Sequence, residues 1–308
     1  MGRRILYRQK LLLNLVDQSD VLLSVVRLHK LMFLLMEKMH ASYYEFIPSA
    51  FGCYSNSLHQ DQNTLLDSNY LSLTKGETPF DSFLTTSHTS LLSKEYTLKA
   101  DDEHVLSSLL HTYKHVDDDN LIELIHNEVP FYGIRSQILH RFDENASLEK
   151  RINNEQSSVK NSLRGLYTIG YEGMTIDGFL QQLIKHNVKI LVDVRKNAFS
   201  MRLEFRKRAF IEALTKAGIK YRSLPEVGIP SHKRKELATV GRQEELFDWY
   251  KKVVLPNNDE AVRIIGSLVD KENVALMCFE KEYFNCHRSY FAEYCRELTP
   301  TIKHVYHL

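Results

Sequence analysis

The residues best suited to chemistry lie close together near the end of the chain. The segment CFEKEYFNCHRS, residues 278–289, contains Cys278, Glu280, Cys286, His287 and Arg288. Thiols and imidazoles are ligands that zinc prefers. A thiol beside cations can act as a nucleophile, and a buried free cysteine often serves only as a small apolar side chain. The segment therefore indicates a metal site, a thiol with an anion site, or a structural turn.

The position of Cys286 favours the thiol with an anion site. Cys286, His287 and Arg288 are expected at the start of a helix that follows a strand and a loop. A helix N-terminus offers free amide groups and a partial positive charge, which would lower the pKa of the Cys286 thiol. We expect Cys286 as a nucleophile, His287 as a general acid or base, and Arg288 as a clamp for phosphate or carboxylate.

Zinc is the alternative at the same place, with Cys278, Cys286 and His287 as its ligands. Ligands within each half of a zinc site are typically only a few residues apart. Here seven residues separate the two cysteines, so the spacing departs from that pattern. A folded loop would still bring the sulfurs together. We assign no cofactor from the sequence and keep zinc as the alternative.

From residue 165 the chain alternates short apolar segments with amphipathic ones. This pattern is typical of a parallel sheet with helices packed on it. The predicted strands are GLYTIGYEG, VKILVDVRK, IKYRSLP, NVALMCFE and IKHVYHL. The fold class expected for the C-terminal part is therefore α/β, with a largely parallel sheet and flanking helices.

The ends of the predicted strands carry most of the remaining polar candidates. In open parallel sheets, ligands bind at the carboxyl ends of the strands. The side chains expected to converge there are Tyr171, Glu172, Asp193, Arg195, Glu226, Cys278 and Glu280. We expect Asp193, Glu226 and Glu280 to orient catalytic groups or to position a sugar hydroxyl. The other four are expected to bind the substrate.

The same stretches resemble a known family. In chain order, YTIGYEGMTIDGFLQQL, LVDVRKNAFSMRLEFRKRAF, GIKYRSLPEVG and LMCFEKEYFNCHRSYFAEY resemble the domain of unknown function 488 family over residues 166–308. The resemblance implies a site made of Asp193-x-Arg195, Ser200-x-Arg202, Glu226-x-Gly228, Cys278-x-Glu280 and Cys286-His287-Arg288. The chain lacks the family's usual proline before Ser200 and has one extra residue, which leaves the binding role of Arg202 open. The resemblance implies a fold and a site but no reaction.

A basic segment adjoins this expected site. RKNAFSMRLEFRKR, residues 195–208, has six arginines or lysines against one glutamate, with Phe199 and Phe205 between them, and HKRK at 232–235 adds more. Such a patch suits a polyphosphate or a nucleic acid, although a solvated helix face has a similar pattern. The expected partner is nucleic acid or a phosphate-bearing small molecule, and a homodimer is left open.

The first 142 residues have the pattern of a different domain. Helices are expected over 5–16, 21–40 and 57–68, and a strand pair follows. This is the element order of a winged helix-turn-helix. Lys30-Leu31 and the loop residues Phe46, Pro48, Gly52 and Ser55 resemble small bacterial winged-helix domains, with a departure at Phe51-Gly52-Cys53. The resemblance implies a domain, extended by helices, that docks DNA or a protein partner.

Acidic and polar segments complete this part of the chain. Asp101 and Asp117–Asp119 could be read as metal ligands, but acidic residues are favoured at helix N-termini and that role is expected here. Residues 143–164 are polar and lack apolar periodicity, so we expect a linker there. The α/β domain would then span 165–308.

Composition excludes several classes of protein. The 308 residues carry a net charge of +1, so any nucleic-acid surface must be a local patch. No apolar run is long enough to span a membrane, and the start lacks the pattern of a secretory signal. Four scattered cysteines do not form a disulfide framework, which favours a cytoplasmic location.

These patterns together predict a two-domain cytoplasmic protein. We expect an enzyme that acts on a nucleotide or nucleic acid, in DNA processing or anti-phage defence. The alternative is a non-catalytic regulator that binds DNA or a partner and senses a small anionic ligand in its α/β domain. The sequence does not decide whether the protein is an enzyme.

Overall fold

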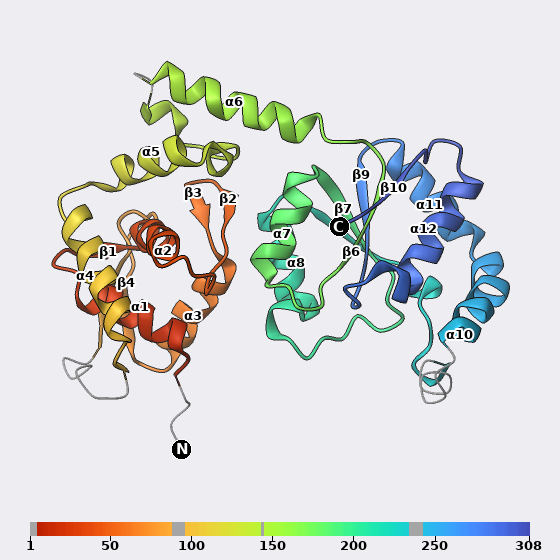
Figure 1. The fold of residues 1–308 in the computed structure, drawn as a ribbon, viewed down its shortest axis with the longest axis horizontal. Helices are drawn as coiled ribbons and strands as arrows, with labels where there is room; N and C mark the ends of the chain where they lie inside the picture. Colours follow the sequence, from red (N-terminus) through yellow and green to blue (C-terminus); the bar gives the residue numbers. More distant parts are fainter. Residues whose placement is uncertain (1–4, 88–95, 143–144, 234–242) are drawn as a thin grey trace. The chain divides into compact units, whose positions relative to one another are not determined.

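The chain divides into two compact units, residues 1–156 and 157–308 (Figure 1). The computed structural model describes residues 5–87, 96–142, 145–233 and 243–308. The segment expected as a linker contains helix α6 (Ala146–Lys160), and the boundary between the units lies within this helix. No helix of the described ranges combines the length and the apolar character that crossing a membrane requires.

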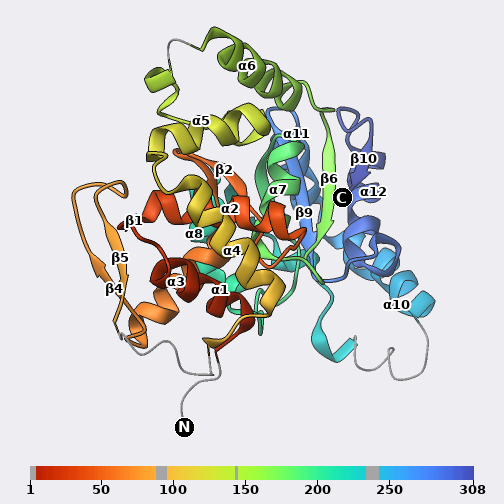
Figure 2. The same cartoon turned by 60° about the vertical axis from the view of Figure 1, so that its left-hand side comes forward.

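The N-terminal unit consists mainly of helices, together with a small antiparallel sheet. The sheet order is β1 (Leu23–Ser24), β5 (Phe83–Thr86) and β4 (Leu71–Thr74), and β4 and β5 form a long hairpin (Figure 2). Strands β2 (Ile47–Ser49) and β3 (Gly52–Tyr54) form a second hairpin. The helices are α1 (Tyr7–Asp17), α2 (Val25–Met39), α3 (Asn56–Asp67), α4 (Ala100–Tyr113) and α5 (Asp118–Glu128).

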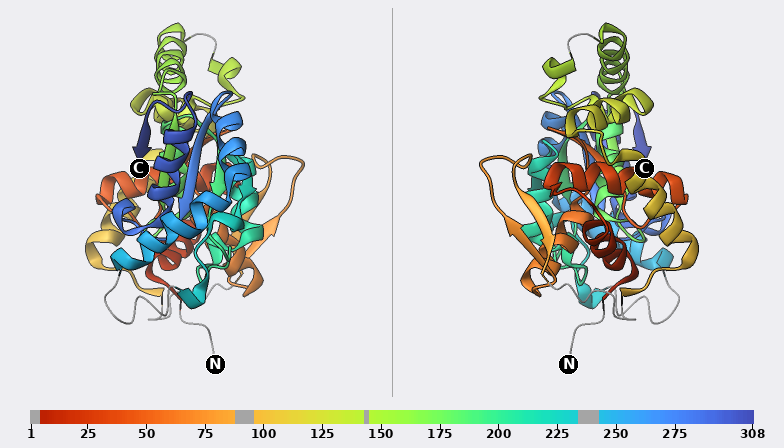
Figure 3. Two further views of the ribbon diagram at one scale, coloured as in Figure 1. Left: turned by 90° about the vertical axis from the view of Figure 1, so that its right-hand side faces the viewer. Right: turned by 90° about the vertical axis from the view of Figure 1, so that its left-hand side faces the viewer.

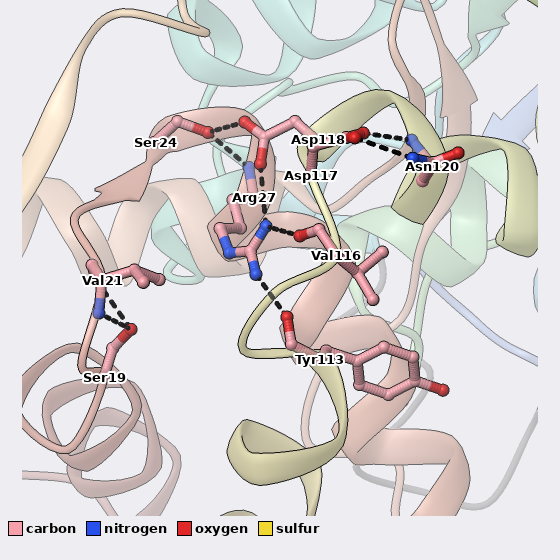
Figure 4. A network of polar contacts seen from close by, with 9 residues as sticks. All are labelled: Ser19, Val21, Ser24, Arg27, Tyr113, Val116, Asp117, Asp118 and Asn120. Atoms are coloured by element: carbon pink, nitrogen blue, oxygen red, sulfur yellow. Dashed lines mark hydrogen bonds and ion pairs between the residues drawn. The ribbon is translucent and has the colours of Figure 1, made fainter.

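A buried polar network fixes the start of α2 against the loop between α4 and α5 (Figure 4). The Ser24 hydroxyl caps α2 by accepting a hydrogen bond from the Arg27 amide at 2.9 Å. The Arg27 guanidinium pairs with Asp118 and donates to the carbonyls of Val116 and Tyr113. The acidic residues expected as caps therefore act locally, with Asp118 in this ion pair.

The neighbouring acidic residues are also engaged locally. Asp117 is the N-cap of α5, and its carboxylate accepts a hydrogen bond from the Asn120 amide at 2.8 Å. Asp119 pairs with Arg141 at 3.0 Å, and Asp101 lies in the first turn of α4. Asp117 therefore has the capping role predicted from the sequence, whereas Asp119 forms an ion pair.

The C-terminal unit contains a five-stranded parallel sheet, as the alternating pattern predicts. The sheet order is β10 (Val305–His307), β6 (Leu166–Gly170), β9 (Asn273–Cys278), β7 (Val188–Asp193) and β8 (Lys220–Ser223). Gly170 lies opposite Cys278, and Asp193 lies opposite both Met277 and Ser223. The last residues of four strands therefore meet at one edge.

Helices cover both faces of this sheet. Figure 1 shows α7 (Ile176–Lys185) and α8 (Lys207–Lys216) on one face, and α11 (Asp259–Val269) and α12 (His287–Leu298) on the other. Figure 3 shows the second pair in blue, and Phe247 of α10 (Gln243–Trp249) packs on Tyr290 of α12. Thr175 caps α7 by accepting a hydrogen bond from the Gly178 amide, and Gly218 follows α8 with a φ of 62°.

Candidate functional site

The site is built around two thiols and an imidazole at the carboxyl end of β9. Cys278 is the last residue of β9, Cys286 is the N-cap of α12, and His287 is its first residue. The loop between them folds back, so that both Sγ atoms and Nδ1 of His287 lie within 4.8 Å of one another. Nδ1 is 3.8 Å from the sulfur of Cys278 and 3.9 Å from that of Cys286. All three residues are buried.

Glu280 is the fourth residue of this cluster. Each thiol donates a hydrogen bond of 3.0 Å to the same carboxylate oxygen, Oε2 of Glu280. Burial alone would raise the pKa of Glu280, but the two thiol hydrogen bonds outweigh it, and the pKa is lowered. Glu280 is half-buried, whereas the other three residues are buried. The carboxylate therefore stands between the cluster and solvent.

The imidazole of His287 is held in one orientation. Its Nε2 lies 3.0 Å from the backbone carbonyl of Val194, which follows strand β7. A carbonyl can only accept, so Nε2 carries a proton and Nδ1 is turned toward the sulfurs. Burial alone would lower the pKa of His287, but the contacts with Cys286, the Val194 carbonyl and Glu280 outweigh it and raise the pKa. The cluster thus favours a positive charge at this point.

The thiol of Cys286 is not activated in the way its helix position suggests. Burial and the neighbouring Cys278 raise its pKa well above the usual value, against the weaker opposite effect of His287. The sequence pattern predicts a lowered pKa, because it reveals the helix N-terminus but not the apolar surroundings. Burial therefore favours the protonated form of the Cys286 thiol.

A rigidly held arginine lies beside the cluster. Arg195 follows Val194, and its guanidinium donates to both carboxylate oxygens of Asp193, at 2.9 and 2.7 Å, and to the Tyr171 hydroxyl at 2.7 Å. Asp193 also accepts a bond of 2.9 Å from the Tyr221 hydroxyl. Burial opposes the charge of Arg195, but Asp193 outweighs it and raises the pKa of the guanidinium. Asp193, Arg195 and Tyr171, predicted to converge, do lie together.

Two glycines allow the strand ends to come this close. A Cβ atom on Gly170 would lie 1.8 Å from the carbonyl oxygen of Glu280, and one on Gly228 would lie 2.1 Å from the amide nitrogen of Lys196. Both distances are far inside van der Waals contact. Gly170 thus lets the loop after β9 cross the end of β6, and Gly228 lets the chain pass against the residues that follow Arg195.

Arg288 differs in role from the expected anion clamp. Its side chain is fully buried and donates to the backbone carbonyls of Glu280 and Lys281. These bonds hold the loop between β9 and α12 in its folded-back shape. Arg288 therefore positions Glu280 and the two cysteines, and its terminal nitrogens are engaged by the protein.

The remaining predicted residues differ in whether they contact the loops of the site. Glu172 accepts a bond of 2.9 Å from the Lys281 amide, and so holds the same loop. Arg202 pairs with Glu204 at 2.7 Å and donates to the Tyr171 carbonyl at 3.3 Å. Glu226 is exposed on the turn after β8, without a hydrogen bond or ion pair to the described cluster residues.

The loops that follow β7 and β9 carry exposed apolar and basic side chains. In the loop after β7, Phe199 and Met201 are 75% and 85% exposed, and Lys196 is exposed. In the loop after β9, Phe279 and Phe284 are exposed as well. The basic segment, residues 195–208, thus begins at Arg195 itself. In the second basic run, Arg234 and Lys235 lie outside the described residues.

Sequence reasoning misses two groups that complete the site. Tyr221 is not among the predicted residues, although it lies two residues before the end of β8, where its hydroxyl reaches Asp193. An aromatic hydroxyl near a strand end is the available signal. The carbonyl of Val194, which orients His287, has no signal, because a backbone group is not visible in the residue types.

The comparison with protein families bears on this part of the chain. Residues 175–295 match the family described as domain of unknown function DUF488. The match lies within the C-terminal unit and contains the cluster together with Asp193 and Arg195. It supports the resemblance read from the sequence motifs. Searches of curated proteins and of solved structures found no match.

Proposed function

We propose that the C-terminal unit is an enzyme that acts on a phosphate-bearing group of a nucleotide or nucleic acid. The observation that carries the proposal is the fixed guanidinium of Arg195 beside the cluster of Cys278, Cys286 and His287. Three of its five N–H groups bond Asp193 and Tyr171, which leaves one N–H on each terminal nitrogen beyond these bonds. A guanidinium presents such pairs to phosphate or carboxylate oxygens.

The surroundings of Arg195 support a nucleotide over a simple anion. Phe199 offers an exposed ring on which a base could stack, and Lys196 adds a cation to the same loop. Tyr171 stacks on Phe205 at 4.4 Å between ring centroids and also carries the hydroxyl that bonds Arg195. The substrate phosphate would bind Arg195, and the base would lie toward the exposed loop.

For the N-terminal unit we propose a winged-helix domain that docks DNA or a protein partner. Its helices and strands follow one another as α1, β1, α2, α3, β4 and β5, and the sheet order is β1-β5-β4. This order supports the resemblance, with β2 and β3 as an added hairpin. Steeply salt-dependent binding of duplex DNA would indicate DNA, and binding that is indifferent to salt would indicate a protein.

The first test is a paired binding and turnover assay. The full chain is incubated with nucleoside mono-, di- and triphosphates and with single-stranded and duplex oligonucleotides, and products are separated by anion-exchange chromatography. Arg195→Met should lower affinity and turnover by about tenfold or more, because a charged hydrogen bond is worth about 1.5–3 kcal/mol. Arg263→Met, on an exposed arginine of α11, is the control. Equal behaviour of both variants toward every ligand would sink the proposal.

A non-catalytic sensor is the second candidate, and one observation favours it. Cys278, Cys286 and His287 are 0%, 1% and 3% exposed, so they are less accessible to a ligand than Arg195, which is 5% exposed. A sensor would bind the phosphate at Arg195 without turnover. The assay separates the two candidates, since a sensor gives Arg195-dependent binding with no product.

A further inference from the structure

We propose that Cys278, Cys286, His287 and Glu280 form a zinc site at the carboxyl edge of the sheet. The ligand atoms would be the two Sγ atoms, Nδ1 of His287 and Oε2 of Glu280. The inference goes beyond the proposed function and does not depend on it, because metal binding is measured without a substrate.

The spacing of the ligand atoms fits a tetrahedral ion. Zinc–sulfur bonds of about 2.3 Å and zinc–nitrogen bonds of about 2.0 Å place sulfur and nitrogen about 3.5 Å apart, and two sulfurs about 3.8 Å apart. Nδ1 of His287 lies 3.8 and 3.9 Å from the two sulfurs, and all three atoms lie within 4.8 Å of one another. The sulfur–nitrogen distances are therefore within about 0.4 Å of this geometry, and the two sulfurs would approach each other by at most about 1 Å on binding.

The orientation of His287 is that of a metal ligand. Its Nε2–H donates to the Val194 carbonyl, so the neutral ring offers the lone pair of Nδ1 to the centre of the cluster. Metal-bound histidines typically donate their second N–H to a carbonyl or carboxylate in this way. The bond to Val194 also anchors the site to strand β7, whereas its other ligands come from β9, the following loop and the start of α12.

The cluster brings four electron-pair donors together with little positive charge among them. Two sulfurs, Nδ1 and Oε2 converge, and with a neutral imidazole only the two thiol protons lie among them, both in bonds to Oε2. On binding, Zn²⁺ would take the place of these two protons, which pass to solvent. Two Zn–S bonds, one Zn–N bond and one Zn–O bond then form, without oxidation or reduction.

The loaded site would carry one net negative charge. Two thiolates, a carboxylate and Zn²⁺ sum to −1 with a neutral imidazole, and the guanidinium that follows Val194 in the chain, that of Arg195, is already paired with Asp193. Two thiolates with an imidazole favour zinc over magnesium or calcium, which prefer oxygen ligands. Glu280 is the ligand nearest solvent, so it is the one that an incoming anion would displace.

The decisive experiment measures metal content by mass spectrometry. The full chain is expressed with added zinc, kept reduced, and purified without chelators or metal-affinity steps, as wild type, Cys278→Ala, Cys286→Ala and Cys295→Ala. We expect about one zinc ion per chain in the wild type and in Cys295→Ala, and at least about a tenfold loss in the other two. Cys295 is the matched control, because it is a fully buried cysteine of α12 outside the cluster.

A second measurement holds even if the alanine variants fail to fold. Reduced, metal-stripped wild type is titrated with Co²⁺, and absorption by thiolate-to-cobalt charge transfer should saturate at about one ion per chain, with release of about two protons. Wild type that lacks zinc and gives no such band would overturn the inference. A disulfide between Cys278 and Cys286, detected by mass spectrometry in protein purified without reductant, would also overturn the inference. Either failure leaves the nucleotide assay unaffected.

Discussion

The buried ion pair between Asp193 and Arg195 should be strongly coupled, and a double-mutant cycle tests this. The carboxylate of Asp193 is fully buried and the guanidinium of Arg195 is 6% exposed. Asp193→Asn replaces one acceptor oxygen with an NH₂ group that faces the guanidinium. Arg195→Met removes the cation but leaves Asp193 its bonds from the Tyr221 hydroxyl and from the residue 195 amide.

The expected losses follow from which group is left unpaired. Breaking a buried pair on one side costs about 3–5 kcal/mol, because the remaining charge stays buried without its partner. Asp193→Asn should reach this range, and Arg195→Met should cost about 3 kcal/mol, since two hydrogen bonds still support the carboxylate. The double variant leaves no isolated charge, so its loss should be smaller than the sum by about 2 kcal/mol or more.

Urea unfolding followed by tryptophan fluorescence reports this energy for the correct unit. The chain has one tryptophan, Trp249, which lies in α10 of the C-terminal unit. The exposed pair of Arg263 and Glu260, three residues apart on α11, provides the matched control cycle, with an expected coupling below about 0.5 kcal/mol. If the losses at Asp193 and Arg195 add, the two side chains are independent and the argument for a fixed guanidinium fails.

Two further predictions concern stability. Gly170→Ala should cost about 1–3 kcal/mol, because its Cβ would meet the Glu280 carbonyl at 1.8 Å, whereas Gly173→Ala has open space and should lose only about 1 kcal/mol to its φ of 77°; equal losses in urea unfolding would contradict the close approach. Burial lowers the pKa of His126 to about 4, against about 6.5 in an unfolded chain. Acid therefore favours the unfolded state, and the unfolding free energy of the N-terminal unit, followed by circular dichroism, should fall by about 3 kcal/mol from pH 6.5 to 4 through His126, in addition to the loss from buried His29, whose pKa is also lowered by burial. His126→Gln should remove the His126 part of this loss, and a pH profile that the substitution leaves unchanged would refute it.

Much of the C-terminal fold follows from local pattern. Continuous apolar runs such as residues 188–193 predict strands buried on both faces, and all five predicted strands are present in one parallel sheet. Because parallel strands end at one edge, the order of strands and helices along the chain is enough to place Tyr171, Asp193 and Cys278 together. The residue types thus predict the position of the site.

The chemistry within the site is harder to predict, for two physical reasons. The pKa of the Cys286 thiol depends on burial by distant segments, which the local helix start does not reveal. The partners of each arginine depend on loop shape, so Arg288 and Arg195 cannot be told apart by sequence, although one bonds backbone carbonyls and the other a carboxylate. Glu226 shows the same limit, since it follows a strand end but remains exposed.

The position of β9 also determines when the site can form during synthesis. β9 lies between β6 and β7 in the sheet but comes after both in the chain, beyond β8. A nascent chain that ends before residue 273 therefore has two strands without the neighbour that joins them, and their unpaired edges are open to other chains. Pairing across so many residues is slow to nucleate. Because β9 also brings Cys278 and the loop to α12, completion of the sheet and assembly of the site are a single event.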